Sequence, residues 1–260
     1  MKASHVQLAR RMHDSPVLQA GSLDSSTESG RYMTPTQPMN IHQPWMASAR
    51  TSVVRKAIVE DLPGIVTIHQ KAFSHFFLTR LGSVFLHRYY GLVLNYRTGI
   101  VLVSEGRGAL NGFACGFVDP AEFYRLMWRN RREFILPALS TLLHHPFLAA
   151  RVLQGIQRIQ TSASRVPVRS CELSSIAVAP EAGGSRLGKT LVQAFLAQAW
   201  SMDAQFVYLT TDADGNALAN ALYRKSGFQQ TRRFLQRKGR WMNEYVIDRM
   251  EASDSCEIRL

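Results

Sequence analysis

A glycine-containing turn between an apolar stretch and a helical pattern is the part of the sequence best suited to chemistry. Gly183, Gly184 and Gly188 lie in this turn, after an apolar stretch that ends at Pro180. From Lys189 onward, apolar residues recur at helical spacing, so we expect a helix to begin at the turn. The first N–H groups of a helix have no partner inside it, and the helix dipole adds partial positive charge there. The turn therefore predicts either a site for phosphate or pyrophosphate, or an ordinary connection between a strand and a helix.

A second strand and helix follow the first pair, and the second helix carries a phenol. Residues 206–209 predict a short buried strand. Asn216 predicts the start of a helix that carries Tyr223 and ends at Gly227, where glycine is the usual C-terminal cap. The stretch 171–228 is thus predicted to form a strand, a glycine turn, a helix, a strand and a helix.

The stretch 171–228 resembles the GNAT N-acetyltransferase superfamily. The family pattern is V-x-P-x-x-(Q/R)-x-x-G-x-G-x-x-L, followed by N-x-x-A-x-x-x-Y-x-x-x-G-F. The second half is matched at every position. The first half departs at Gly183, where the family usually has Gln or Arg, and at Arg186, where it usually has Gly. The resemblance is weaker over 53–249. The residues that carry it are Val178, Pro180, Gly183, Arg186, Gly188, Leu191, Asn216, Ala219, Tyr223, Gly227 and Phe228.

The resemblance implies that acetyl-CoA is the co-substrate. The glycine turn and the helix start would hold the CoA pyrophosphate through backbone N–H groups. The strand before the turn would pair through its backbone with the pantetheine arm, and the N–H of Val178 would face the thioester carbonyl. Asn216 would bind the end of the pantetheine. The expected cofactor-binding residues are Ile176, Ala177, Val178, Gly183, Gly184, Ser185, Arg186, Leu187, Gly188, Lys189, Thr190 and Asn216.

Acetyl transfer to an amine also needs a group that protonates the leaving thiolate and a way to obtain a neutral amine. Tyr223 is the candidate general acid, or else a core tyrosine. Glu172, on the strand before the turn, is the candidate base, since burial would raise the pKa of its carboxyl toward a useful value. Asp212 is the second candidate. Many amines lose their proton to water, so a dedicated base can also be absent.

The same resemblance implies a GNAT fold of the α/β (α+β) class, with a mixed twisted central sheet of about six to seven strands flanked by helices. Periodicity in the residues predicts the elements themselves. Gly82 is expected to weaken or break the helix predicted at 75–96. Outside the motif stretch, strands are expected at 53–58, 100–104, 110–118, 234–235 and 241–248, and helices at 60–73 and 75–96.

A long segment, 119–165, separates the strand that ends at Val118 from the motif strand. It is predicted to be a helical insertion, because a connection of this length usually has its own structure or a function. Helical patterns cover 123–143 and 147–159, and the segment holds seven arginines against three acidic residues. It is interpreted as a lid with a solvated basic face, as a lid over the acceptor, or as a contact with an anionic membrane surface.

Composition and length fit one domain with two tails. A chain of 260 residues with 46% hydrophobic content can form a sizeable core. Residues 51–250 are assigned to the GNAT domain and 251–260 to a polar tail. Residues 1–50 are rich in Ser, Thr, Gln and Pro and are predicted to be disordered. Their acidic residues argue against an organelle transit peptide.

Three further properties limit the class of protein. No stretch reaches the roughly 18 consecutive apolar residues of a membrane helix. The three cysteines form no C-x-x-C pair, which argues against a zinc site or a disulfide framework, so we expect a cytoplasmic protein without a metal. A net charge of +12 fits an acidic ligand or surface but does not identify nucleic acid as a partner. The oligomeric state is left open, with a dimer as one option.

Two functions from different classes follow. The first is an acetyl-CoA-dependent N-acetyltransferase acting on a primary amine, with a small amine or an amino sugar preferred over a protein N-terminus or lysine as acceptor. The second is a GNAT-fold protein that binds an acyl-CoA, or a partner through the basic insertion, without turnover. Tyr223 and Asn216 favour the enzyme, and Arg186 in the glycine turn favours the binding protein.

Overall fold

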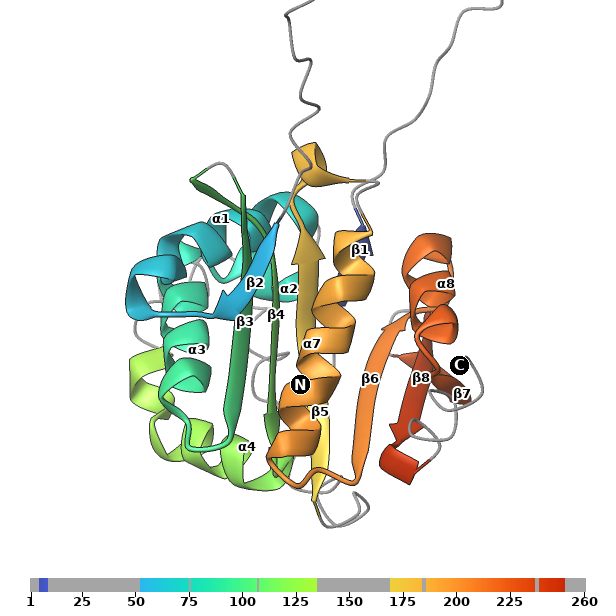
Figure 1. The fold of residues 1–260 in the computed structure, drawn as a ribbon. Coiled ribbons are helices and arrows are strands. Elements are labelled where there is room, and N and C mark those ends of the chain that lie inside the picture. The colour runs from blue at the N-terminus through green and yellow to red at the C-terminus, as the bar shows by residue number, and fades with distance from the viewer. Residues whose placement is uncertain are drawn as a thin grey trace, which may run out of the picture. The chain divides into compact units, whose positions relative to one another are not determined.

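A computed structural model describes residues 5–8, 52–74, 76–106, 108–134, 169–183, 186–236 and 239–250. They form a mixed sheet with the strand order β2-β3-β4-β5-β6-β8-β7, and β1 pairs with β5 outside this order (Figure 1). The strands β2 to β8 agree with the expected sheet. The strands are β1 His5–Leu8, β2 Val53–Lys56, β3 Gly99–Gly106, β4 Ala109–Val118, β5 Ser170–Val178, β6 Phe206–Asp212, β7 Gln229–Gln236 and β8 Arg240–Asp248.

Helices cover both faces of the sheet. Helices α1, α3 and α4 pack on one face, and α7 and α8 contribute to the core on the other. Figure 1 shows α7 crossing in front of the central strands. The helices are α1 Leu62–Ala72, α2 Phe77–Arg80, α3 Ser83–Asn95, α4 Pro120–Arg129, α7 Leu187–Ser201 and α8 Ala217–Lys225, with short 3-10 turns η1 at Val59–Asp61 and η3 at Pro180–Ala182.

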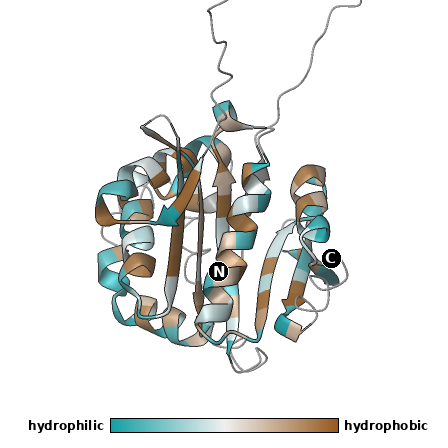
Figure 2. Ribbon diagram, viewed as in Figure 1, coloured by the Kyte–Doolittle hydropathy of each residue, from teal (hydrophilic) through white to brown (hydrophobic). Residues whose placement is uncertain are grey.

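The two cores follow from alternation along the strands. Val101 and Val103 of β3 lie in the core with α1 and α3, whereas Ile100 and Leu102 lie in the core with α7. All residues of β5 are buried, as expected for a strand covered on both faces. Figure 2 shows the same pattern, since the central strands are mostly brown and the outer helices alternate between brown and teal.

Most predicted elements are present with shifted ends. Gly82 breaks the helical stretch 75–96 into α2 and α3 and has a φ of +93°. The helix predicted from residue 123 starts instead at Pro120, whose fixed φ suits a first turn. Strand β7 begins at Gln229, well before the predicted 234–235. Its first five residues are exposed and carry no apolar alternation, which is why periodicity missed them.

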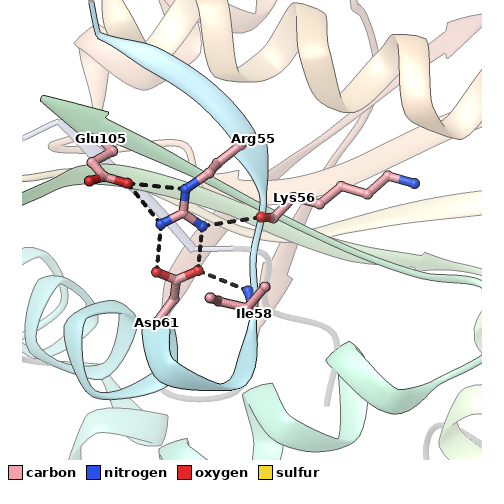
Figure 3. A network of polar contacts seen from close by, with 5 residues as sticks. All are labelled: Arg55, Lys56, Ile58, Asp61 and Glu105. Carbon is pink, nitrogen blue, oxygen red and sulfur yellow. Dashed lines mark hydrogen bonds and ion pairs between the residues drawn. The ribbon is translucent and has the colours of Figure 1, made fainter.

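The edge strand β2 is tied to the first helical turn by a charged network (Figure 3). The Arg55 guanidinium donates to both carboxylate oxygens of Asp61, at 2.6 and 2.9 Å, and to Glu105 Oε2 on β3 at 2.8 Å. Asp61 Oδ2 also accepts the N–H of Ile58 at 2.8 Å, which fixes the start of η1. The Arg55 hydrogen bond lowers the pKa of Asp61 below its ordinary value. This network links β2 and the start of η1 to β3.

The expected tails and insertion are tested only in part. Residues 5–8 form β1, which differs from the disordered tail expected over 1–50. The rest of that tail, residues 135–168 of the insertion and the tail 251–260 lie outside the described residues. Helix α4 agrees with a helical start to the insertion.

A buried histidine on α1 makes the stability of the fold depend on pH. His69 is fully buried, and its Nδ1 lies 2.6 Å from the Tyr90 hydroxyl. Burial lowers the pKa of His69 from 6.5 to about 3. The unfolded chain therefore takes up a proton on this side chain at a higher pH than the folded chain does. The contribution of the neutral His69 side chain to the free energy of unfolding is therefore complete above pH 6.5 and is lost as the pH falls toward 3.

We expect His69→Gln to reduce the acid sensitivity of the fold. Between pH 6.5 and 3, His69 alone should cost the native protein up to about 1.4 kcal/mol of unfolding free energy per pH unit. Urea unfolding at pH 7, 6 and 5 measures the slope, with His87→Gln on the exposed side of α3 as the control. Equal slopes in the native protein and in His69→Gln would contradict this assignment.

Candidate active site

Strands β5 and β6 pair over a short length and then separate. They are parallel and paired only from Ser170 to Glu172, opposite residues 206–208. Figure 1 shows the two strands diverging from this end. Farther along, from Ser175 to Val178, the edge of β5 is paired with β1 instead. The separation leaves backbone groups in the middle of the sheet available to a partner other than β6.

The N–H groups of this edge can be assigned from one hydrogen bond. Ala179 donates its N–H to the Asn111 carbonyl on β4 at 2.7 Å. Successive N–H groups of a strand point to opposite edges, so those of Ile176 and Val178 point away from β4, toward the separation. Of the three predicted pantetheine-pairing residues, these two thus direct an N–H to it, whereas that of Ala177 points to β4. In this structure the edge faces β1.

The glycine turn leads from the end of β5 to the first turn of α7. Gly183 follows η3, and Gly184 and Ser185 lie outside the described residues. Arg186 is the cap residue of α7, and its carbonyl accepts the N–H groups of Lys189 and Thr190 at 3.0 and 3.2 Å. The N–H groups of Leu187 and Gly188 precede the first of these helical hydrogen bonds, as the first amides of a helix do. The predicted loop residues that are described therefore form a helix start at the mouth of the separation.

Arg186, the main departure from the family pattern, adopts a backbone that favours glycine. Its φ is +56° and its ψ is 3°, which is the left-handed region. A residue with a Cβ costs roughly 1–2 kcal/mol there. The side chain is exposed. The turn thus keeps the glycine conformation although the glycine is replaced.

Tyr223, the predicted acid, lies on the α7 face of the sheet with an unpaired hydroxyl. Its side chain is fully buried, with ring centroids 5.6 Å from Tyr245 and 5.7 Å from Phe228. Among the described residues its hydroxyl has no hydrogen-bond partner. Burial raises its pKa well above 10, so the phenol keeps its proton. A buried O–H without a partner is rare and fits a group reserved for a ligand.

Glu172, the predicted base, is held on the opposite face. It is 2% exposed and occupies the last position of β5 that pairs with β6. Tyr124 on α4 donates its hydroxyl to Oε1 at 2.9 Å, and Tyr208 on β6 donates to Oε2 at 2.8 Å. Burial, and next the charge of Glu172, raise the pKa of both phenols, which keeps them protonated donors. The two tyrosines fix the carboxylate where the strands begin to separate.

The alternative base is engaged elsewhere. Asp212, the last residue of β6, forms a bidentate ion pair with Arg240 at the start of β8, with Nη2–Oδ2 at 2.6 Å and Nε–Oδ1 at 3.0 Å. The Arg240 guanidinium also lies over the Phe76 ring, 5.2 Å from its centroid. Asp212 therefore joins β6 to β8, and Arg240 also contacts the segment before α2.

The start of α8 depends on two asparagines, of which Asn220 was not predicted from the sequence. Asn216, the predicted pantetheine-binding residue, donates its Nδ2 to Thr211 Oγ1 at 2.7 Å. Asn220 donates to the carbonyls of Asp212 and Asn216 at 2.9 and 2.8 Å, and its Oδ1 accepts from Asn243 at 2.9 Å. An asparagine inside a predicted helix is unfavourable, and that was the available signal. No signal in the sequence indicated that Tyr124 and Tyr208 would donate hydrogen bonds to Glu172.

Two absences hold for the described residues. No group of three or more His, Cys, Asp or Glu side chains there could hold a metal ion. Among the helices of the same residues, none combines the length and the apolar character needed to cross a bilayer.

We expect Arg186→Gly to stabilise the domain by about 0.5–1 kcal/mol, because glycine adopts the left-handed backbone without a Cβ penalty. Arg125→Gly on the exposed side of α4 is the matched control and should cost about 1 kcal/mol. Urea unfolding of both variants measures the difference. A loss of stability in Arg186→Gly would show that the arginine side chain itself holds the turn.

We expect Tyr223→Phe to change the free energy of unfolding by less than about 0.5 kcal/mol, because the hydroxyl has no hydrogen-bond partner among the described residues. Tyr245→Phe is the control. Its hydroxyl donates to Asn220 Oδ1 at 2.9 Å and accepts from Arg224 at 3.1 Å, so its removal should cost about 1–3 kcal/mol. Thermal and urea unfolding compare the two. Equal losses would mean that Tyr223 has a partner in solution.

Comparison with protein families gives one match. Residues 148–228 match the model of the acetyltransferase (GNAT) family. This range contains the glycine turn and both helices that border the candidate site. A comparison with curated proteins finds no match at the sequence level.

Comparison with solved structures shows the same fold. A ribosomal-protein-alanine N-acetyltransferase from Brucella melitensis aligns with a TM-score of 0.50 and 21% identity, over 75% of this chain and 99% of that chain. An N-acetyltransferase from Staphylococcus aureus Mu50 aligns with a TM-score of 0.51 and 17% identity, over 76% and 98%. A mutant spermidine N-acetyltransferase from Vibrio cholerae aligns with a TM-score of 0.51 and 15% identity, over 79% and 98%.

At these identities the structural likeness concerns the fold, and the family match adds the class. The structural likeness agrees with the expected GNAT fold, and the family match over 148–228 agrees with the acyltransferase class expected from the motif residues. Residues 148–228 are therefore similar to the acetyltransferase (GNAT) family, and the described residues share the fold of these solved N-acetyltransferases, while the subfamily stays open.

Proposed function

We propose that this protein is an acetyl-CoA-dependent N-acetyltransferase that moves an acetyl group to a primary amine by direct attack. One arrangement carries the proposal. Helix α7 begins beyond the end of β5, the N–H of Val178 points away from β4, and Tyr223, on the helix α8 that contacts β1, has a buried hydroxyl without a partner among the described residues. Acetyl-CoA would supply an activated acetyl thioester, and the remaining steps concern residues of this chain.

The residues present fit the cofactor. Helix α7 begins at the end of the separation, and the N–H groups of Leu187 and Gly188 would receive a phosphate there. The edge of β5 accepts an extended chain, as its pairing with β1 demonstrates, and a pantetheine arm has similar amide groups. The hydroxyl of Tyr223 would provide the donor for the sulfur end, since it lacks a partner among the described residues.

The chemistry divides between the two faces of the sheet. On one face, Glu172 would take a proton from the acceptor ammonium, directly or through water, while Tyr124 and Tyr208 keep its carboxylate oriented. The N–H of Val178 would donate to the developing oxyanion. On the other face, Tyr223 keeps its proton at neutral pH and would deliver it to the leaving thiolate.

The acceptor is proposed only as a primary amine, with a small amine or an amino sugar preferred. Two structural neighbours act, by their names, on spermidine and on an alanine of a ribosomal protein. A protein N-terminus or a lysine is the alternative acceptor class.

The assay measures free thiol released from acetyl-CoA with spermidine, glucosamine, an N-terminal alanine peptide and a lysine peptide as acceptors. We expect Glu172→Gln to lower kcat/KM by about 100-fold or more, and Tyr223→Phe to lower kcat by a similar factor. The rate left in Glu172→Gln should rise with pH, because it depends on amine that is already neutral. Glu105→Gln, whose carboxylate binds Arg55 on another part of the sheet, is the control.

Two results would contradict the proposal. A chain that binds acetyl-CoA in calorimetry but transfers acetyl to none of these acceptors would support the non-catalytic alternative. Unchanged rates in both Glu172→Gln and Tyr223→Phe would remove the assigned acid and base.

A further inference from the structure

The strand β1 occupies the edge of β5 that the proposed cofactor needs. Residues His5 to Leu8 run parallel to β5, with His5 opposite Ser175 and Leu8 opposite Val178. This register covers Ile176 and Val178, whose N–H groups point away from β4. The helix α8, which carries Tyr223, also approaches β1.

One edge of a strand can bind only one extended partner at a time, because each backbone N–H and C=O on it serves a single register. We propose that the gap between β5 and β6 is a strand-accepting site whose internal ligand is residues 5–8, and that this segment competes with the acetyl-CoA arm. The identification of acetyl-CoA as the competitor rests on the proposed function. The pairing of residues 5–8 with β5 is independent of it.

The segment has the properties of a reversible occupant. Its sequence HVQL alternates polar and apolar residues, and Val6 is β-branched, which favours an extended backbone. Only four residues pair, and the gain per backbone hydrogen bond is similar in size to the entropy cost of ordering a residue. The chain from residue 9 to residue 52 tethers the segment to β2, which raises its effective concentration at the gap. A weak but tethered strand binds often and leaves easily.

Competition lowers the apparent affinity for the cofactor by the fraction of molecules whose gap is free. Binding of acetyl-CoA must in turn release the segment. The edge would thus be covered when no cofactor is present, which protects an interior strand edge from pairing with another chain.

The test uses the full chain with the double substitution Val6→Pro and Gln7→Pro. Proline lacks the N–H, and two successive prolines remove a donor in either orientation of the strand. The matched control is Ala20→Pro with Gly21→Pro, in the same tail but outside β1. Calorimetry measures the Kd for acetyl-CoA, and hydrogen exchange measures the amides of Ile176 and Val178 without ligand.

We expect the β1 variant to bind acetyl-CoA about 3- to 10-fold more tightly than the control, with an unchanged kcat. The amides of Ile176 and Val178 should exchange faster in the β1 variant. Equal Kd values would overturn the competition, whatever the exchange shows. Acetyl-CoA binding to neither protein would count against the proposed function instead. Exchange would then decide the pairing alone, and equal protection of both amides would overturn it.

Discussion

The structure depends on the early departure of β6 from β5. A parallel pair that continued along β5 would satisfy every backbone group of its edge and leave no place for a ligand inside the sheet. Pairing that stops at Glu172 leaves the next residues with N–H groups that need another partner. That unsatisfied edge links the fold to the chemistry, since it binds β1 in this structure and would bind the cofactor arm in the proposed reaction.

The covered faces of the sheet give the two proposed catalytic groups different surroundings. Glu172 lies among hydroxyl groups from α4 and β6, which donate to both of its carboxylate oxygens. Tyr223 lies beside the rings of Phe228 and Tyr245, and burial, and next the charge of Tyr245, raise the pKa of its phenol. The proposed base and the proposed acid thus lie on opposite faces of the sheet.

Several parts of the fold were accessible from local patterns. Apolar periodicity located most strands and helices, and Gly82 marked a real break. Apolar periodicity did not predict strands whose side chains are exposed, or strands that form only by pairing with a neighbouring edge. The first residues of β7 are exposed polar side chains, and β1 is four residues in a tail rich in Ser and Gln. Such strands form because a neighbouring edge is available, and a neighbour in space leaves no trace in local sequence.

By itself, the sequence determined the resemblance to the GNAT family, the glycine turn at the start of α7 and the choice of Tyr223, Asn216 and Glu172 as residues of interest, because these depend on local motifs and spacing. Only the tertiary structure decided their state. It left the hydroxyl of Tyr223 without a partner among the residues that the structure describes, joined Asp212 to Arg240, and placed two tyrosines from distant elements on Glu172. Hydrogen bonding and burial are set by contacts between residues far apart in the chain, which spacing along the chain does not encode.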